Sequence, residues 1–110
     1  MFSLYYDVLK NIDRLEFIET DLSRITPWMM DVLIKNKTTK LKLIEFLNKH
    51  QIETRIFYPP IHSLAPYQSS NKSFPVTKNI SDRGLWLPSS VTLEEEDVMR
   101  VSRLVKKFFL

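Results

Sequence analysis

The sequence predicts an α+β fold, an α/β sandwich with helices packed on a small mixed or antiparallel sheet. Short apolar runs typical of strands alternate with segments of helical periodicity, which favours helices layered on a sheet. The 110 residues suit one domain with a modest core. The hydrophobic fraction of 44%, with aromatic residues spread along the chain, is that of an ordinary globular protein.

The first third of the chain predicts a helix and two strands. Apolar residues recur at helical spacing over residues 2–12, so the chain is expected to start inside an amphipathic helix without an N-terminal cap of its own. Residues 15–19 alternate like a strand, and residues 21–26 are typical of a turn. Residues 28–34 have the length and composition of a buried strand, which Pro27 can open.

The middle of the chain predicts a helix, a strand and a long loop. Thr38 or Thr39 can cap a helix that runs to about His50. A short strand is expected over residues 51–58, and it ends at two consecutive prolines because proline has no N–H to donate to a ladder. Residues 62–78 are rich in Ser, Asn, Pro and Lys and predict a surface loop.

The last third of the chain predicts a strand and a well-marked helix. Residues 80–83 suggest one helical turn that Gly84 breaks, and residues 85–87 suggest a short strand. Thr92 and Glu95 match a capping box for the final helix. Its predicted inner face consists of residues at helical spacing: Val98, Val101, Val105 and Phe108.

Composition and charge restrict the function classes. Sixteen basic and thirteen acidic residues are interleaved, and the pI of about 9.2 without a clustered basic stripe gives a nucleic-acid partner little support. The chain has no cysteine, which excludes disulfides and zinc–thiolate sites and fits a cytoplasmic protein. No apolar run approaches bilayer length. We predict no metal site. The acidic run 94–96 is typical of the start of a helix, and no other potential metal ligands are expected to converge on it.

The sequence also predicts no cofactor-binding or catalytic residue within this chain. Phosphate cradles normally use glycine-rich turns that lead into a helix, and the chain has one glycine. A Schiff-base lysine needs a desolvated amine or a neighbouring cation. The ten lysines all stand in polar stretches of sequence, so each is expected to be a solvated surface residue.

The densest group of polar and aromatic residues lies at the rigid bend over residues 54–62. Arg55 could pair with phosphate or carboxylate, Tyr58 could hydrogen-bond a sugar hydroxyl, and His62 could donate or accept near neutral pH. The alternative is structural. In that case Arg55 pairs with Glu53 or Glu45, the aromatic residues pack in the core, and His62 only begins a loop.

Three further residues are given structural interpretations. Trp28 and Trp86 are expected to anchor the core or an interface more readily than to form a ligand platform. His50 closes a predicted helix, where an imidazole near the last carbonyls is an ordinary choice, and we assign it no functional role.

Four blocks of sequence, in order, resemble the C-terminal region of the DegT/DnrJ/StrS-type aminotransferases. These blocks are ITPWMMD (25–31), IETRIFYPPIH (52–62), FPV (74–76) and GLWLPSS (84–90). Within that family the sequence is most similar to perosamine synthetases. These enzymes use pyridoxal phosphate to transfer an amino group from glutamate to a nucleotide-linked 4-keto-6-deoxy sugar, a step in polysaccharide or O-antigen sugar biosynthesis. The resemblance implies the C-terminal small-domain fold of fold-type I pyridoxal-phosphate transferases.

The resemblance also implies a domain organisation. Residues 1–14 would be the end of the helix that links two domains, residues 15–110 would be the small domain, and the large cofactor-binding domain is absent from the chain. The family carries its Schiff-base lysine in that large domain, so no catalytic residue can be carried over. The resemblance does allow a substrate-binding role to be carried over to Arg55, Tyr58 and His62, because in the family this segment lies on the substrate side of the cleft at a dimer interface.

Two hypotheses about function follow. In the first, the chain works only with a separately encoded large domain or an aminotransferase dimer partner, and the nucleotide sugar binds to the assembled enzyme. In the second, it is a stand-alone interaction or oligomerisation module without enzymatic activity, and a homo-oligomer is then expected.

Overall fold

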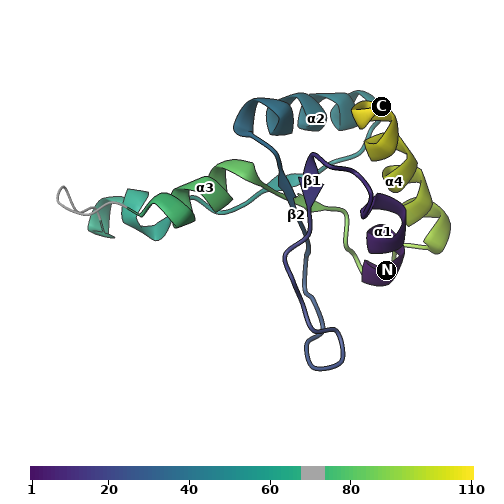
Figure 1. Ribbon diagram of the computed structural model, residues 1–110, viewed down its shortest axis with the longest axis horizontal. Helices are drawn as coiled ribbons and strands as arrows, with labels where there is room; N and C mark the ends of the chain where they lie inside the picture. Colours follow the sequence, from purple (N-terminus) through teal and green to yellow (C-terminus); the bar gives the residue numbers. More distant parts are fainter. Residues whose placement is uncertain (68–73) are drawn as a thin grey trace.

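The computed structural model describes residues 1–67 and 74–110, and in this part of the chain four strands form one sheet (Figure 1). The strand order is β1-β2-β4-β3, and every neighbouring pair is antiparallel. The strands are β1 (Leu15–Glu16), β2 (Met30–Ile34), β3 (Arg55–Ile56) and β4 (Gly84–Leu87). The predicted α+β fold is confirmed, and its sheet is antiparallel.

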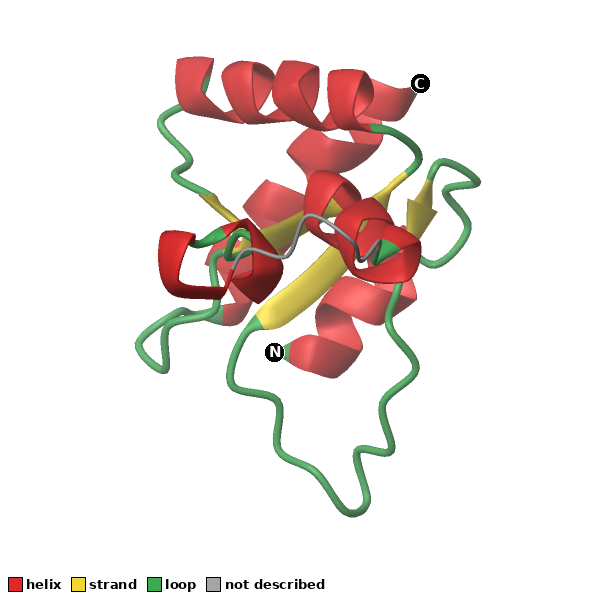
Figure 2. Cartoon of the chain, turned by 90° about the vertical axis from the view of Figure 1, so that its left-hand side faces the viewer, coloured by secondary structure: helices red, strands yellow, loops and turns green. Residues whose placement is uncertain are grey.

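Helices lie on both sides of this sheet. They are α1 (Phe2–Leu9), α2 (Lys37–Lys49), α3 (Pro75–Arg83) and α4 (Glu95–Phe109), with short 3-10 turns η1 (Ile61–Ser63) and η2 (Ala65–Tyr67). In Figure 1, α1 and α4 lie side by side on one side of the strands, α2 crosses the top, and α3 extends away on the other side. Figure 2, viewed from that other side, places α3 in front of the strands.

The core lies between the sheet and helices α1, α2 and α4. Alternate residues of β2 turn toward these helices, so Met30, Val32 and Ile34 are almost fully buried. Leu85 and Leu87 of β4 share this face because they pair with β2 in register. The helices and flanking segments contribute the remaining buried apolar residues: Tyr5, Leu9, Leu15, Leu43, Leu47, Ile52, Val98, Val101 and Val105.

Tyr5 ties α1 to the end of β4. Its ring is fully buried in the core, and its hydroxyl donates to the backbone oxygen of Pro88 over 2.8 Å. Burial is the main reason that the pKa of the Tyr5 hydroxyl lies above its ordinary value, and the charge of Asp97 adds to the shift. The hydroxyl is therefore held as a neutral donor.

Three strands are shorter than the sequence predicts. Segments 15–19 and 51–58 contribute only two strand residues each, and β2 begins at Met30 instead of Trp28. The edge strand β3 can pair only along β4, which is itself four residues long. Residues 17–29 then form a long arm that leaves the sheet between β1 and β2, at the bottom of Figure 1.

Both predicted helix caps are displaced. Asn36, and neither of the following threonines, caps α2, because its side-chain oxygen accepts from the Thr39 N–H over 2.8 Å. In α4 the capping box consists of Glu94 and Asp97, with the Glu94 N–H donating to Asp97 over 3.0 Å, so the predicted Thr92–Glu95 box is wrong by two residues.

Much of the predicted 62–78 loop is structured. It contains the end of η1, all of η2 and the first turn of α3, while residues 68–73 lie outside the described residues. Pro75 at the start of α3 has the fixed φ that suits a first helical position. Gly84 ends this helix as predicted and also opens β4.

Lys40 contradicts the prediction that every lysine is solvated. Its residue is only 4% exposed, and its Nζ donates to the backbone oxygen of Ser81 in α3 over 3.4 Å. Burial lowers the pKa of Lys40 from its ordinary value; the charge of Asp82 opposes this shift, and that of Lys37 reinforces it to a smaller degree. Lys40 therefore has a buried amine, and this amine holds α2 against α3.

Candidate functional site

The candidate site is built on the outer face of the sheet, opposite the core. The strand register places Asp31, Trp86 and Arg55 in one row across β2, β4 and β3. Asp31 and Trp86 point away from the core because their neighbours in the strands are buried in it, and Arg55 shares their face because it pairs directly with Trp86. The Trp86 indole N–H donates to the Asp31 carboxylate, which fixes the plane of the ring.

Two further aromatic residues surround Trp86. Phe57 lies 5.2 Å from the Trp86 ring centroid, and Tyr58 meets the indole edge-on at 5.0 Å with an interplanar angle of 81°. The Phe57 ring covers Gly84, where a Cβ atom would collide with it, so this close approach requires glycine. Trp86 is therefore held by one hydrogen bond and two ring contacts.

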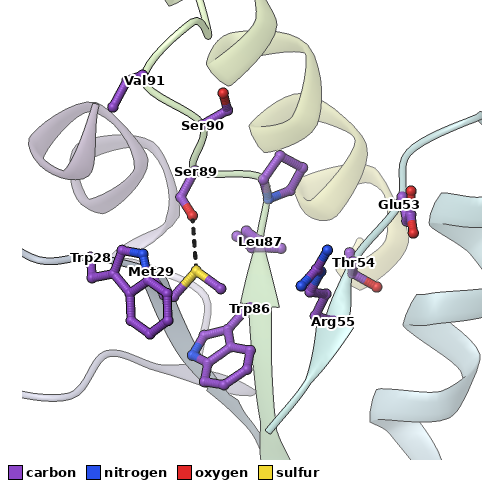
Figure 3. A pocket seen from close by; sticks show the side chains of 11 residues that line it. Trp28, Met29, Glu53, Thr54, Arg55, Trp86, Leu87, Ser89, Ser90 and Val91 are labelled. Atoms are coloured by element: carbon purple, nitrogen blue, oxygen red, sulfur yellow. Dashed lines mark hydrogen bonds between the residues drawn. The ribbon is translucent and has the colours of Figure 1, made fainter.

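A pocket of about 450 Å³ lies at the end of β4, lined by residues from both neighbouring segments, and we name it the Arg55 pocket (Figure 3). Its lining residues come from the arm 17–29, from β3 and its preceding turn, and from β4 and the turn after it. They are Trp28, Met29, Glu53, Thr54, Arg55, Trp86, Leu87, Pro88, Ser89, Ser90 and Val91. Figure 3 shows the indoles on one side of the opening and Arg55 on the other.

A second pocket of about 360 Å³, which we name the Tyr58 pocket, adjoins Trp86 as well. It is lined by Phe57, Tyr58, Pro60, Thr77, Ile80, Ser81 and Trp86, so α3 forms one of its walls. The Ser81 hydroxyl donates to the backbone oxygen of Tyr58 over 3.2 Å and ties α3 to the chain after β3. Trp86 is common to both pockets.

The three predicted binding residues are not in one pocket. Arg55 lines the first pocket and Tyr58 the second. His62 lies in η1, where its ring packs on Phe74 with centroids 4.6 Å apart, and it lines neither pocket. The structure thus places both Arg55 and Tyr58 next to Trp86, by strand pairing and by a ring contact respectively, and leaves His62 farther along the chain.

The structural alternative for these residues holds only in part. Within the described residues the Arg55 guanidinium has no ion pair, and Glu45 instead pairs with Lys49 at 3.5 Å. Phe57 is partly buried as that alternative expects, but Tyr58 is 68% exposed and does not belong to the core.

The prediction that Trp28 anchors the core is wrong, and the alternative that it anchors an interface stays a prediction. Its residue is 76% exposed at the rim of the Arg55 pocket. Asp31 and Ser89 are not among the site residues that the sequence predicts. Only the strand register brings Asp31 to Trp86, so no local signal in the sequence could have found this pair.

The described residues do not form a cradle for a phosphorylated aldehyde cofactor. The one glycine, Gly84, faces the Phe57 ring and leaves no free backbone for an anion. The buried amine of Lys40 lies between α2 and α3 and lines neither the Arg55 nor the Tyr58 pocket. No cluster of three potential metal ligands occurs among residues 1–67 and 74–110. In the same ranges, no helix is long and apolar enough to cross a membrane.

The fold defines the class of protein. Superposition on TlmJ, an aminotransferase from Streptoalloteichus hindustanus, gives a TM-score of 0.84 over 96% of this chain and 29% of TlmJ, at 20% identity. DesI, solved in the presence of its TDP-sugar product, gives a TM-score of 0.82 over 96% of this chain and 29% of DesI, at 24% identity. The chain has the fold of the corresponding part of these aminotransferases.

Residues 1–106 match the model of the DegT/DnrJ/EryC1/StrS aminotransferase family, and the chain belongs to this family, whose members are pyridoxal-phosphate-dependent aminotransferases. It is 26% identical over 102 residues to the GDP-perosamine synthase of Escherichia coli O157:H7, covering 91% of this chain and 28% of that protein. It is 33% identical over 69 residues to the GDP-perosamine synthase of Vibrio cholerae, covering 61% and 19%. The chain thus spans less than a third of these relatives.

Proposed function

We propose that the chain acts as the C-terminal small domain of a pyridoxal-phosphate-dependent aminotransferase for a nucleotide-linked 4-keto-6-deoxy sugar. The observation that carries the proposal is the family match over residues 1–106 combined with coverage of 28% of a GDP-perosamine synthase. Residues 1–14 would be the end of a linker helix and residues 15–110 the small domain. The cofactor and its lysine would then belong to a separate large domain.

The chemistry of the outer sheet face supports a substrate-binding role. Arg55 offers a fork of donors suited to phosphate, and Tyr58 presents an exposed phenol suited to a sugar hydroxyl. His62 could add a contact from η1 if the substrate extends past Phe74. In this role the domain binds and orients the sugar nucleotide and excludes water, while the bound cofactor supplies the amino-transfer chemistry.

The proposal predicts that the chain alone does not transfer amino groups. The test incubates it with glutamate, pyridoxal phosphate and a GDP-linked 4-keto-6-deoxy sugar, with and without a large domain from a perosamine synthase, and detects the amino sugar by mass spectrometry. Product is expected only in the mixture, and the large domain alone is the control. Product from the chain alone would refute the proposal, as would no product with any large domain tested.

A second candidate is favoured by the exposed apolar residues. Trp28, Ile56 and Val91 are all exposed, although each is large and apolar. Exposed apolar side chains of this size suit an interaction or oligomerisation module. Sedimentation over a range of concentrations tests this candidate, which expects a dimer or larger assembly and is refuted by a monomer throughout.

A further inference from the structure

We infer that the tip of the arm between β1 and β2 is a docking element for the large domain of the aminotransferase. The arm tip comprises residues 18–25. The inference deepens the proposed function and rests on it for the identity of the partner. It assigns a contact surface that lies outside both the Arg55 pocket and the Tyr58 pocket.

The arm tip carries apolar side chains that its own domain does not cover. Ile18, Leu22 and Ile25 are 38%, 44% and 56% exposed. In the described part of the chain, neither the buried core nor the apolar residues packed against it include any of these three. Exposed apolar side chains gathered on one short segment are typical of a contact surface for another protein.

The arm tip holds its shape by contacts within itself. The Asp21 carboxylate accepts from the Ser23 N–H over 3.0 Å, and the Asp21 backbone oxygen accepts from the Ile25 N–H over 2.9 Å. These bonds close a single turn, on which residues three apart, such as Leu22 and Ile25, face the same side. Among the described residues, no hydrogen bond joins the tip to the rest of the chain. The apolar pair is therefore held in a fixed arrangement, which lowers the cost of ordering it on binding.

Charged side chains border this apolar pair. Glu19 and Arg24 are exposed, and neither forms an ion pair with another described residue. An apolar centre with a polar rim is the usual composition of a protein–protein contact. The partner surface that fits the tip is therefore an apolar patch with polar groups at its edge.

The position of the arm argues for the large domain as the partner. Both ends of the arm flank the start of α1. The Phe17 ring meets the Phe2 ring edge-on with centroids 6.5 Å apart, and at the other end Pro27 and Met29 line a small pocket together with Phe2. In Figure 1 the arm extends away from the sheet on the side where α1 begins. Under the proposed function α1 continues a helix from the large domain, so the arm lies beside the point at which that domain enters.

The length of the relatives supports the same partner. The chain spans 28% of the GDP-perosamine synthase of Escherichia coli O157:H7, so most of an assembled enzyme of this kind lies outside the chain. A second copy of the chain would not supply those missing parts. The large domain is therefore the occupant to which we assign the arm tip.

Substitutions at the tip and at a matched surface position test the inference. The probe is the large domain of the Escherichia coli O157:H7 synthase, used once its absorbance shows that it binds pyridoxal phosphate. Leu22→Ser and Ile25→Ser are each expected to weaken its complex with the chain about tenfold or more, because each removes an apolar side chain from the contact. The control Leu41→Ser on α2, where the leucine is 52% exposed, should change the dissociation constant by less than about twofold.

Two results of this comparison would overturn the inference. One is equal affinity of Leu22→Ser and Leu41→Ser for the large domain. The other is the absence of any complex up to about 100 µM of each protein.

Hydrogen exchange identifies what covers the tip. In the complex with the large domain, the amides of residues 22–25 should exchange at least about tenfold more slowly than in the chain alone. Unchanged exchange at these amides in the complex would contradict the inference. Slowing that grows with the concentration of the chain alone would identify a second copy as the occupant and would also contradict it.

The two proposals can fail separately. A complex that depends on Leu22, with no amino transfer in any mixture, would refute the proposed function and leave the docking surface standing. Amino transfer in the mixture, with an affinity insensitive to Leu22 and Ile25, would refute the docking surface and leave the proposed function standing.

Discussion

Replacement of Gly84 by alanine tests the packing that holds the site wall. The Cβ of an alanine would lie 2.5 Å from Cε2 of Phe57 and closer still to Cγ and Cδ2. The backbone of Gly84, with φ −75° and ψ 141°, is open to any residue, so the substitution causes no backbone strain. The whole effect should therefore come from the collision with the Phe57 ring.

The magnitude follows from which atoms collide. Cγ is the fixed end of the ring, so rotation about the Cβ–Cγ bond does not relieve the overlap, and either the Phe57 rotamer or β3 must shift. Overpacking of this kind costs about 1–3 kcal/mol, and we expect about 2 kcal/mol. For a domain of this size that corresponds to a fall in Tm of roughly 8 to 16 °C.

Urea unfolding followed by circular dichroism measures the loss, and a second substitution identifies its cause. Phe57→Ala removes the obstacle, so Gly84→Ala in that background should cost nothing or stabilise slightly by restricting the unfolded chain. The expected coupling between the two positions is about 2 kcal/mol. A Gly84→Ala cost below about 0.5 kcal/mol, or an equal cost in both backgrounds, would refute the packing argument.

Three other substitutions test the core and its polar contacts by the same unfolding assay. Tyr5→Phe removes the donor to the carbonyl after β4 and should cost about 1 kcal/mol. Burial and Asp97 raise the pKa of Tyr5, so the contribution of its hydroxyl to folding stability is complete below about pH 10 and is lost as the pH rises through the folded-state pKa. The Tyr5→Phe variant should therefore lose less stability than the parent between pH 8 and about pH 11. Lys40→Met should raise the free energy of unfolding by about 1 kcal/mol at neutral pH, because it removes a buried charge. The control Lys42→Met, at an exposed position, should change it by less than about 0.5 kcal/mol. If Lys40→Met is instead less stable than the parent, the contact of Lys40 with α3 outweighs the cost of burying its charge. Arg83→Lys should cost about 2 kcal/mol because lysine cannot reach the three acceptors on β1, β2 and α3 at once, and an unchanged midpoint would contradict this.

The order and type of most elements could be predicted because their signals are local. Helices α1, α2 and α4 carry apolar residues at helical spacing, and the strands are short apolar runs between turns. The boundaries could not be predicted as well. Several residues near each helix start can serve as caps, and the packing of the helix selects one, as with Asn36 ahead of α2 and Glu94 ahead of α4.

Only the last turn of helix α3, residues 80–83, could be predicted from the sequence, because the helix is held by distant contacts. Its sequence is polar, and no residue of it is fully buried. Arg83 anchors it by donating to the Ile34 backbone oxygen over 2.7 Å and to Glu16 over 3.0 Å. The burial of Lys40 has the same origin, since α3 shelters an amine that stands among polar neighbours in the sequence.

The candidate site, like the fold, could be predicted only in part from local sequence signals. Arg55 and Tyr58 could be selected from residue chemistry at a rigid bend, and they do lie at pockets. Their neighbour Trp86, which lines both pockets, is brought to Arg55 by the strand register, and register is a property of strand pairing that no single strand contains.

The two faces of the sheet have different tasks, one in the core and one in the candidate site. The inner face is covered by α1, α2 and α4 and provides nearly all of the buried apolar residues, so the domain has its core without outside help. The outer face keeps its aromatic residues in place by contacts among themselves, chiefly the Trp86 hydrogen bond and the packing of Phe57 on Gly84. Because these contacts form within the chain, the Trp86 ring that lines both pockets is held in position before any ligand binds, which lowers the cost of ordering it on binding.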